Sequence, residues 1–202
     1  MKRLLTGLAL AALLAACAVD TSPDSSPAAV AAAAFSPSGP KKITVYTMIN
    51  NRTGNGAHTA MLVNGSQQVI FDPAGSFRDA RVVEKGDVLY GMTPSWIQAY
   101  KSAHARETFH VVSQEMTVSA EQAETALRLV QNNGTVPAAY CASVTTGLLK
   151  QVPGYSDIES TFYPAKLMEQ LEKRPGVITT RYYENDSGDV IDAVRAQQAV
   201  QQ

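Results

Sequence analysis

Cys141 is the side chain in this sequence best suited to covalent chemistry. The 202-residue chain has two cysteines, and the other, Cys17, lies in an N-terminal segment of different character. A thiol becomes a nucleophile when a neighbouring base takes its proton, and histidine is the usual base near neutral pH. The chain has three histidines, His58, His104 and His110. The sequence therefore offers a cysteine–histidine site, against the simpler interpretation of Cys141 as a small buried hydrophobic residue.

The segment around Cys141 favours the first interpretation. Pro137 is expected to open a helix that includes Cys141 and runs to about residue 152. The N–H groups at the start of a helix carry partial positive charge. That charge lowers the pKa of a nearby thiol, and the same groups can donate hydrogen bonds to an oxyanion.

His58 is the best candidate for the base. It follows the turn-rich residues 54–56 at the start of an expected strand, where a side chain can reach a cleft. His104 lies late in an expected helix and is interpreted as a solvated or helix-terminal residue. His110 lies in an expected strand between Phe109 and Val111, which is typical of a sheet-surface position.

The expected elements alternate between strands and helices in a pattern typical of an α+β fold. An Asn64-Gly65 turn signal between two short apolar runs indicates a hairpin. Thr93 and Ser119 have the spacing of helix N-caps, before Pro94 and with Gln122 three residues on. We expect strands at 43–49, 59–63, 68–72, 88–90, 107–112 and 177–183, and helices at 94–105, 119–131, 137–152 and 164–173.

These landmarks together resemble a known family. His58 begins a strand, residues 71–75 (Phe-Asp-Pro-Ala-Gly) end its hairpin partner, and Tyr140-Cys141 opens a later helix, which is similar to the circularly permuted papain-like cysteine hydrolases of the NlpC-type superfamily. Residues 162–167, with Pro-Gly-Val at 175–177, are also similar to the segment after the cysteine helix in that group. The resemblance covers roughly residues 43–183. It implies a permuted papain-like fold, in which helices pack on an antiparallel sheet and the histidine precedes the cysteine.

The family implies a third, polar residue that orients the imidazole from the strand after the histidine strand. Asp72 is the first candidate and Gln68 the second. A three-residue loop at 64–66 would place Asp72 opposite His58 on the same face. A two-residue turn at Asn64-Gly65 would place Phe71 there and point Asp72 away. Otherwise Asp72 caps the turn before Pro73.

The N-terminus has the pattern of a bacterial lipoprotein signal. Lys2 and Arg3 precede an apolar stretch at 4–14, which is too short to span a bilayer. Leu14-Ala15-Ala16-Cys17 resembles a lipobox, which implies cleavage before Cys17 and lipidation of that residue, although a plain secretory signal remains the alternative. Ala18 in the next position suggests the outer membrane. The expected organisation is a signal peptide at 1–16, lipidated Cys17 with an Ala/Ser/Pro-rich tether at 17–41, a folded domain at 42–186, and a tail at 187–202 that forms a frayed helix.

Composition excludes several functions. The 17 Lys and Arg residues are balanced by 18 Asp and Glu residues, a formal net charge of −1, which argues against nucleic acid as a partner. The three histidines lack metal-ligand spacing, and the sequence has no glycine-rich phosphate loop, so we expect no metal and no cofactor.

The sequence supports two functional hypotheses. In the first, the protein is a cell-envelope lipoprotein whose Cys141, His58 and Asp72 cleave or transfer an acyl group held in an amide or ester. The resemblance implies such substrates, and the envelope suggests peptidoglycan peptides, acylated lipids or acylated proteins. In the second, the same fold is a non-catalytic binding or structural module, in which Cys141 and His58 lie apart or the thiol is sealed in apolar packing.

Overall fold

The computed structural model describes residues 23–75 and 77–185. The expected signal peptide at 1–16, the expected lipidation site Cys17 and the expected tail at 187–202 lie outside the described residues. Within the described part, no helix is long and apolar enough to cross a membrane.

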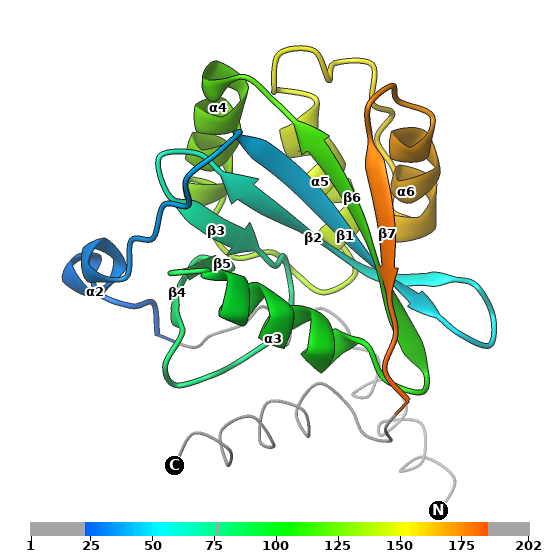
Figure 1. The fold of residues 1–202 in the computed structure, drawn as a ribbon, viewed down its shortest axis with the longest axis horizontal. Coiled ribbons are helices and arrows are strands. Elements are labelled where there is room, and N and C mark those ends of the chain that lie inside the picture. The colour runs from blue at the N-terminus through cyan, green and yellow to red at the C-terminus, as the bar shows by residue number, and fades with distance from the viewer. Residues whose placement is uncertain (1–22, 76, 186–202) are drawn as a thin grey trace, which may run out of the picture.

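An antiparallel sheet forms the centre of the described chain (Figure 1). Its order is β4-β5-β3-β2-β1-β6-β7, so the two long neighbours of β1 come from opposite halves of the sequence. The strands are β1 (Lys42–Asn50), β2 (Gly56–Asn64), β3 (Gln68–Phe71), β4 (Val83–Lys85), β5 (Val88–Tyr90), β6 (Phe109–Thr117) and β7 (Ile178–Tyr182).

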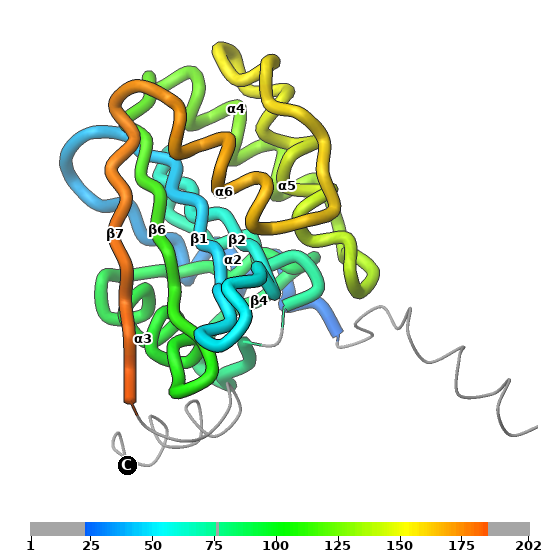
Figure 2. Tube along the Cα trace, turned by 90° about the vertical axis from the view of Figure 1, so that its right-hand side faces the viewer, coloured from blue at the N-terminus to red at the C-terminus, as the bar shows by residue number. Residues whose placement is uncertain are grey.

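Helices cover both faces of this sheet (Figures 1 and 2). Helices α4 (Ala120–Gln131), α5 (Cys141–Leu149) and α6 (Pro164–Glu172) lie on one face, and α3 (Pro94–His104) lies on the other. Alternate residues of β1 supply the two cores: Ile43 and Val45 pack in the cluster with α4–α6, and Tyr46 and Met48 pack in the cluster with α3. Both faces are buried, which explains why β1 reads as an almost continuous apolar run.

The α+β prediction is confirmed, and so are the predicted helix N-caps Thr93 and Ser119. The Thr93 side chain accepts a hydrogen bond from Trp96, and Ser119 forms a reciprocal capping box with Gln122. The short strand β4 has no counterpart among the predicted strands. The helix predicted from Pro137 is wrong at its start, because α5 begins at Cys141.

The segment expected to be a tether is packed on the domain over much of its length. It forms α2 (Pro27–Ala32), and the N–H of Gly86 donates to the Asp24 carboxylate over 2.8 Å. The N–H of Ser25 donates to the carbonyl of Glu84 over 2.9 Å, and the carbonyl of Phe35 accepts from Gln68 over 2.7 Å. The expected tether is therefore bound to the domain between residues 24 and 35, because the Asp24 carboxylate and the backbone of Ser25 and Phe35 pair with groups of β3, β4 and the β4–β5 turn that would otherwise lack partners.

Candidate active site

Cys141 is the first residue of α5. Tyr140 is the N-cap, and its side chain makes no capping hydrogen bond. Ala139 has a left-handed φ of 70°, which turns the chain sharply into the helix and prevents the helix from starting at Pro137. The thiol therefore lies at the very start of the helix, where free N–H groups are most concentrated.

The sulfur of Cys141 is in hydrogen-bond contact with the His58 ring and with two backbone N–H groups, those of Thr59 and Ala142. The pairing of β2 with β3 ends at Met61 and Phe71, so β3 does not take the Thr59 N–H. Cys141 is 7% exposed. The sulfur is thus buried among polar groups beyond the last β2–β3 residue pair, and it is not enclosed by apolar side chains alone.

Asp72 receives two hydrogen bonds on one carboxylate oxygen. The Nε2 of His58 lies 2.7 Å from Oδ1, and the Tyr100 hydroxyl donates to the same oxygen over 2.6 Å. Because Nε2 is engaged by Asp72, the contact with the Cys141 thiol falls to Nδ1 of the ring. The structure therefore connects a thiol, an imidazole, a carboxylate and a phenol in one chain of hydrogen bonds.

Both registers considered for the hairpin are wrong. Asn64 pairs with Gln68 and Met61 with Phe71, so the connection is the three residues 65–67. Continuing this register puts Asp72 level with Ala60, two residues along from His58. Residues two apart on a strand share a face, so Asp72 and His58 meet diagonally.

The charges of Asp72, His58 and Cys141 shift one another's pKa values. Burial alone would lower the pKa of His58, but the negative charges of Asp72 and of the Cys141 thiolate outweigh it and raise that pKa to about 10. Burial alone would raise the pKa of Asp72, but the charge of His58 and the hydrogen bonds from His58 and Tyr100 lower it to about 2. Asp72 is therefore ionised at neutral pH and favours a protonated imidazole.

The pKa of the Cys141 thiol is lowered, opposite to the shift of its partner His58. Burial alone would raise the pKa of Cys141, but the hydrogen bond and positive charge of His58, with the N–H groups of Thr59 and Ala142, lower it below its usual range. A lowered thiol pKa beside a raised imidazole pKa is the signature of a thiolate–imidazolium pair.

The other residues considered from the sequence, Gln68, His104 and His110, do not contact the Cys141 sulfur. Gln68 donates from its side chain to the Met92 carbonyl, away from the imidazole. His104 is helix-terminal, the second of its two expected interpretations, since it ends α3, but it is buried and not solvated. Its Nδ1 lies 2.8 Å from the Tyr100 carbonyl oxygen, and its ring stacks on that of His58 with centroids 6.1 Å apart. His110 is a sheet-surface residue as expected, held by Asn51 over 2.7 Å.

Asp87 is a residue that sequence reasoning missed. Its buried Oδ2 accepts from the N–H of Ala74 over 2.9 Å and from the N–H of Val136 over 2.8 Å. Its own carbonyl accepts from the N–H of Asp72 over 2.8 Å. One residue thus joins the loop after Asp72 to the loop that leads into Cys141.

Backbone strain is concentrated around the same contacts. Among the described residues, the non-glycine positions with positive φ are Ala74, Asp87 and Ala139, at 55°, 59° and 70°. Each lies in a loop that borders the site, and such strain persists only where the surrounding structure enforces it. Gly75 adds a steric constraint, since a Cβ there would lie 1.8 Å from Oδ2 of Asp72.

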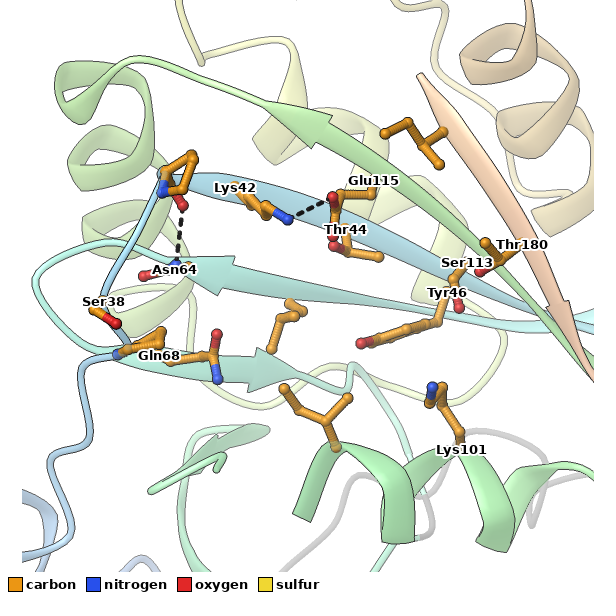
Figure 3. A pocket seen from close by; sticks show the side chains of 15 residues that line it. Ser38, Lys42, Thr44, Tyr46, Asn64, Gln68, Lys101, Ser113, Glu115 and Thr180 are labelled. Carbon is orange, nitrogen blue, oxygen red and sulfur yellow. Dashed lines mark hydrogen bonds and ion pairs between the residues drawn. The ribbon is translucent and has the colours of Figure 1, made fainter. Parts of the chain in front are cut away.

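The described residues hold no metal cluster, but they form a second cavity. Within 23–75 and 77–185, no group of three or more His, Cys, Asp or Glu side chains is placed to hold a metal ion. A separate cavity of about 470 Å³ lies between α3 and the sheet (Figure 3). Its lining contains an ion pair of 2.7 Å between Lys42 and Glu115, and Cys141 is not among the residues that line it.

Comparison of the chain with family models, curated proteins and solved structures finds no match.

Proposed function

We propose that the protein is a thiol-dependent acyl hydrolase or acyltransferase with a permuted papain-like fold, in which Cys141 is the nucleophile, His58 the base and Asp72 the residue that orients His58. The observation that carries the proposal is the continuous hydrogen-bond chain from Cys141 through His58 to Asp72. It brings together three residues that the sequence separates widely, with each pKa shifted in the direction that nucleophilic catalysis needs.

The first half of the reaction forms a thioester. The Cys141 sulfur attacks the carbonyl carbon of an amide or ester, and the carbonyl oxygen becomes an oxyanion within reach of the N–H groups at the start of α5. The oxyanion then collapses, the bond to nitrogen or oxygen breaks, and His58 gives its proton to the departing amine or alcohol.

The second half restores the thiol. Water, or an acceptor hydroxyl or amine, loses a proton to His58 and attacks the thioester carbon. The C–S bond breaks, the carboxylic acid or transferred acyl product leaves, and the thiolate–imidazolium pair returns. Asp72 holds the ring through Nε2 in both halves, so that Nδ1 always faces the reacting atoms.

The proposed setting is the cell envelope. The lipobox-like Leu14-Ala15-Ala16-Cys17 supports a lipid anchor on Cys17, and Ala18 supports the outer membrane as the destination. Substrates within reach are peptidoglycan peptides, acylated lipids and acylated proteins.

The test is the acyl-enzyme itself. Full-length protein would be purified from membranes and incubated with an activated ester such as p-nitrophenyl acetate, with a thioester and with a peptide amide, and the Cys141 peptide would be followed by mass spectrometry. We expect a transient acyl adduct on Cys141 in the wild type, a lasting but slower adduct in Cys141→Ser, and none at this position in Cys141→Ala. His58→Gln should slow acylation by about 10²–10⁴-fold. Absence of any adduct in the wild type would overturn the proposal.

The second candidate, a non-catalytic module, is favoured by one observation, the low exposure of the Cys141 thiol. The acyl-enzyme experiment distinguishes the enzyme from the non-catalytic module. A module predicts no turnover and equal behaviour of wild type and His58→Gln, whereas an enzyme predicts a large difference.

A further inference from the structure

Three exposed aromatic side chains flank the candidate active site: Tyr140 at 44%, Phe162 at 58% and Tyr163 at 70% exposure. We call these residues the aromatic rim. The rings of Tyr140 and Phe162 meet edge to face, with centroids 5.5 Å apart. Large apolar groups gathered on a surface usually mark a place of contact with another molecule.

The rim borders both reacting side chains. Tyr140 directly precedes Cys141 in the chain. Pro164, the residue after Tyr163, packs so closely on Gly56 that a Cβ on that glycine would lie 2.9 Å from it. Gly56 is two residues before His58, so one end of the rim lies beside the thiol and the other beside the strand that carries the base.

The packing of residues 24–35 limits how far the expected lipid anchor on Cys17 can lie from the domain. Asp24 is bound at the β4–β5 turn through the N–H of Gly86. Cys17 lies seven residues before Asp24, and seven residues span at most about 25 Å. A folded domain of the size described here is about 40 Å across. A lipid on Cys17 therefore holds the β4–β5 end of the domain close to the bilayer.

The loop that leads to Tyr140 of the rim begins beside the same turn. A Cβ on Gly86 would lie 3.2 Å from the Cα of Gly134, and Asp87 binds the N–H of Val136. Four residues lead from Val136 to Tyr140, a span of at most about 14 Å. The point where the tether leaves the domain and the aromatic rim are thus joined through one short loop.

From this placement we propose that the aromatic rim docks on the surface of the bilayer that holds Cys17, so that the Cys141 site works at the lipid surface. Tyrosine and phenylalanine suit this position, because their rings enter the interfacial region while the tyrosine hydroxyls stay with the headgroups. The inference rests on the lipid anchor proposed above.

Tryptophan fluorescence tests the docking. The chain has one tryptophan, so full-length lipoprotein carrying Trp96→Phe gives a dark background. Phe162→Trp and Tyr163→Trp place a reporter in the rim. Tyr183→Trp is the matched control, since Tyr183 is 55% exposed just beyond β7, and β7 and α5 lie on opposite sides of the molecule in Figure 2.

Each variant is reconstituted in phosphatidylethanolamine–phosphatidylglycerol vesicles, with or without brominated acyl chains. We expect a blue shift and loss of most emission for the reporters at 162 and 163, and little change for the reporter at 183. Equal quenching of all three, or quenching of none, would overturn docking through the rim. Failure of the protein to float with the vesicles would overturn the anchor and this inference with it. Acylation of Cys141, measured on the same vesicles, reports the enzymatic proposal separately.

Discussion

His58 and Asp72 are joined by a hydrogen bond of 2.7 Å although they do not face each other across the β2–β3 hairpin. Asp72 directly follows β3, level with Ala60, and the contact is diagonal. Tyr100, from α3, donates to the same carboxylate oxygen over 2.6 Å. The Asp72 carboxylate orients the imidazole, and Tyr100, from the helix on the face opposite α5, holds that carboxylate in turn.

Replacing Asp72 with Asn should lower the acylation rate of Cys141 by about 10²–10⁴-fold. The amide keeps the size of the side chain but removes the charge that favours the imidazolium. Burst kinetics with an activated ester measure this rate. Asp157→Asn is the matched control, because the Asp157 side chain is exposed and pairs with Arg174, not with His58. A wild-type rate in Asp72→Asn would show that Asp72 only caps its turn.

Tyr100→Phe should have a smaller effect, about 10-fold in the same rate, since one hydrogen bond to a charged group is lost while Asp72 stays ionised. The variant leaves Oδ1 of Asp72 with His58 as its partner. A loss as large as that of Asp72→Asn would mean that Tyr100 fixes the position of the carboxylate and not only its charge.

The reactivity of Cys141 should depend on pH in a defined direction. The positive charge of His58 lowers the pKa of the thiol, so the thiolate persists as the pH falls below the ordinary thiol pKa of about 8.5. Alkylation by iodoacetamide, followed on the Cys141 peptide, should therefore have its midpoint below that value. In His58→Gln the burial of the sulfur is no longer opposed by a charge, and the midpoint should move upward. Identical midpoints in the two proteins would contradict the ion pair.

Asp87 is a positioning residue, and its test compares two variants. Asp87→Ala removes the acceptor of the Ala74 and Val136 N–H groups, so the two site loops should separate, with loss of stability of about 2 kcal/mol and an upward shift of the Cys141 alkylation midpoint. Asp87→Asn keeps an acceptor oxygen and should restore the midpoint. If both variants keep the wild-type midpoint, Asp87 serves stability alone.

Gly75 and Gly147 give a matched pair of alanine substitutions. A Cβ at Gly75 would collide with the Asp72 carboxylate, whereas a Cβ at Gly147, within α5, meets nothing within 4 Å. Gly147→Ala should stabilise the protein by about 0.5–1 kcal/mol through helix propensity. Gly75→Ala should destabilise it and reduce acylation. Thermal unfolding and burst kinetics measure the two effects, and a neutral Gly75→Ala would show that Asp72 has room to move.

Local sequence patterns predicted most of the elements because each depends on near neighbours. Thr93 and Ser119 start helices through hydrogen bonds to residues three positions on. The same reasoning failed at Pro137, where a left-handed Ala139, enforced by the surrounding loops, delays the helix to Cys141. It also failed for residues 24–35, whose Ala/Ser/Pro-rich composition predicted a tether, because β3, β4 and the β4–β5 turn, far along the sequence, bind Asp24, Ser25 and Phe35.

The sequence by itself determined which residues could react: a cysteine at a helix start, a histidine at the start of a strand, an acidic residue at the end of the next strand. Residue type and local propensity are properties of short segments, so they can be read directly. Only the tertiary structure decided that the sulfur meets the imidazole at the end of β3, that Asp72 reaches it diagonally, and that Tyr100 and Asp87 complete the arrangement. Those contacts depend on hairpin register and on the packing of helices against opposite faces of one sheet, and no local pattern specifies either.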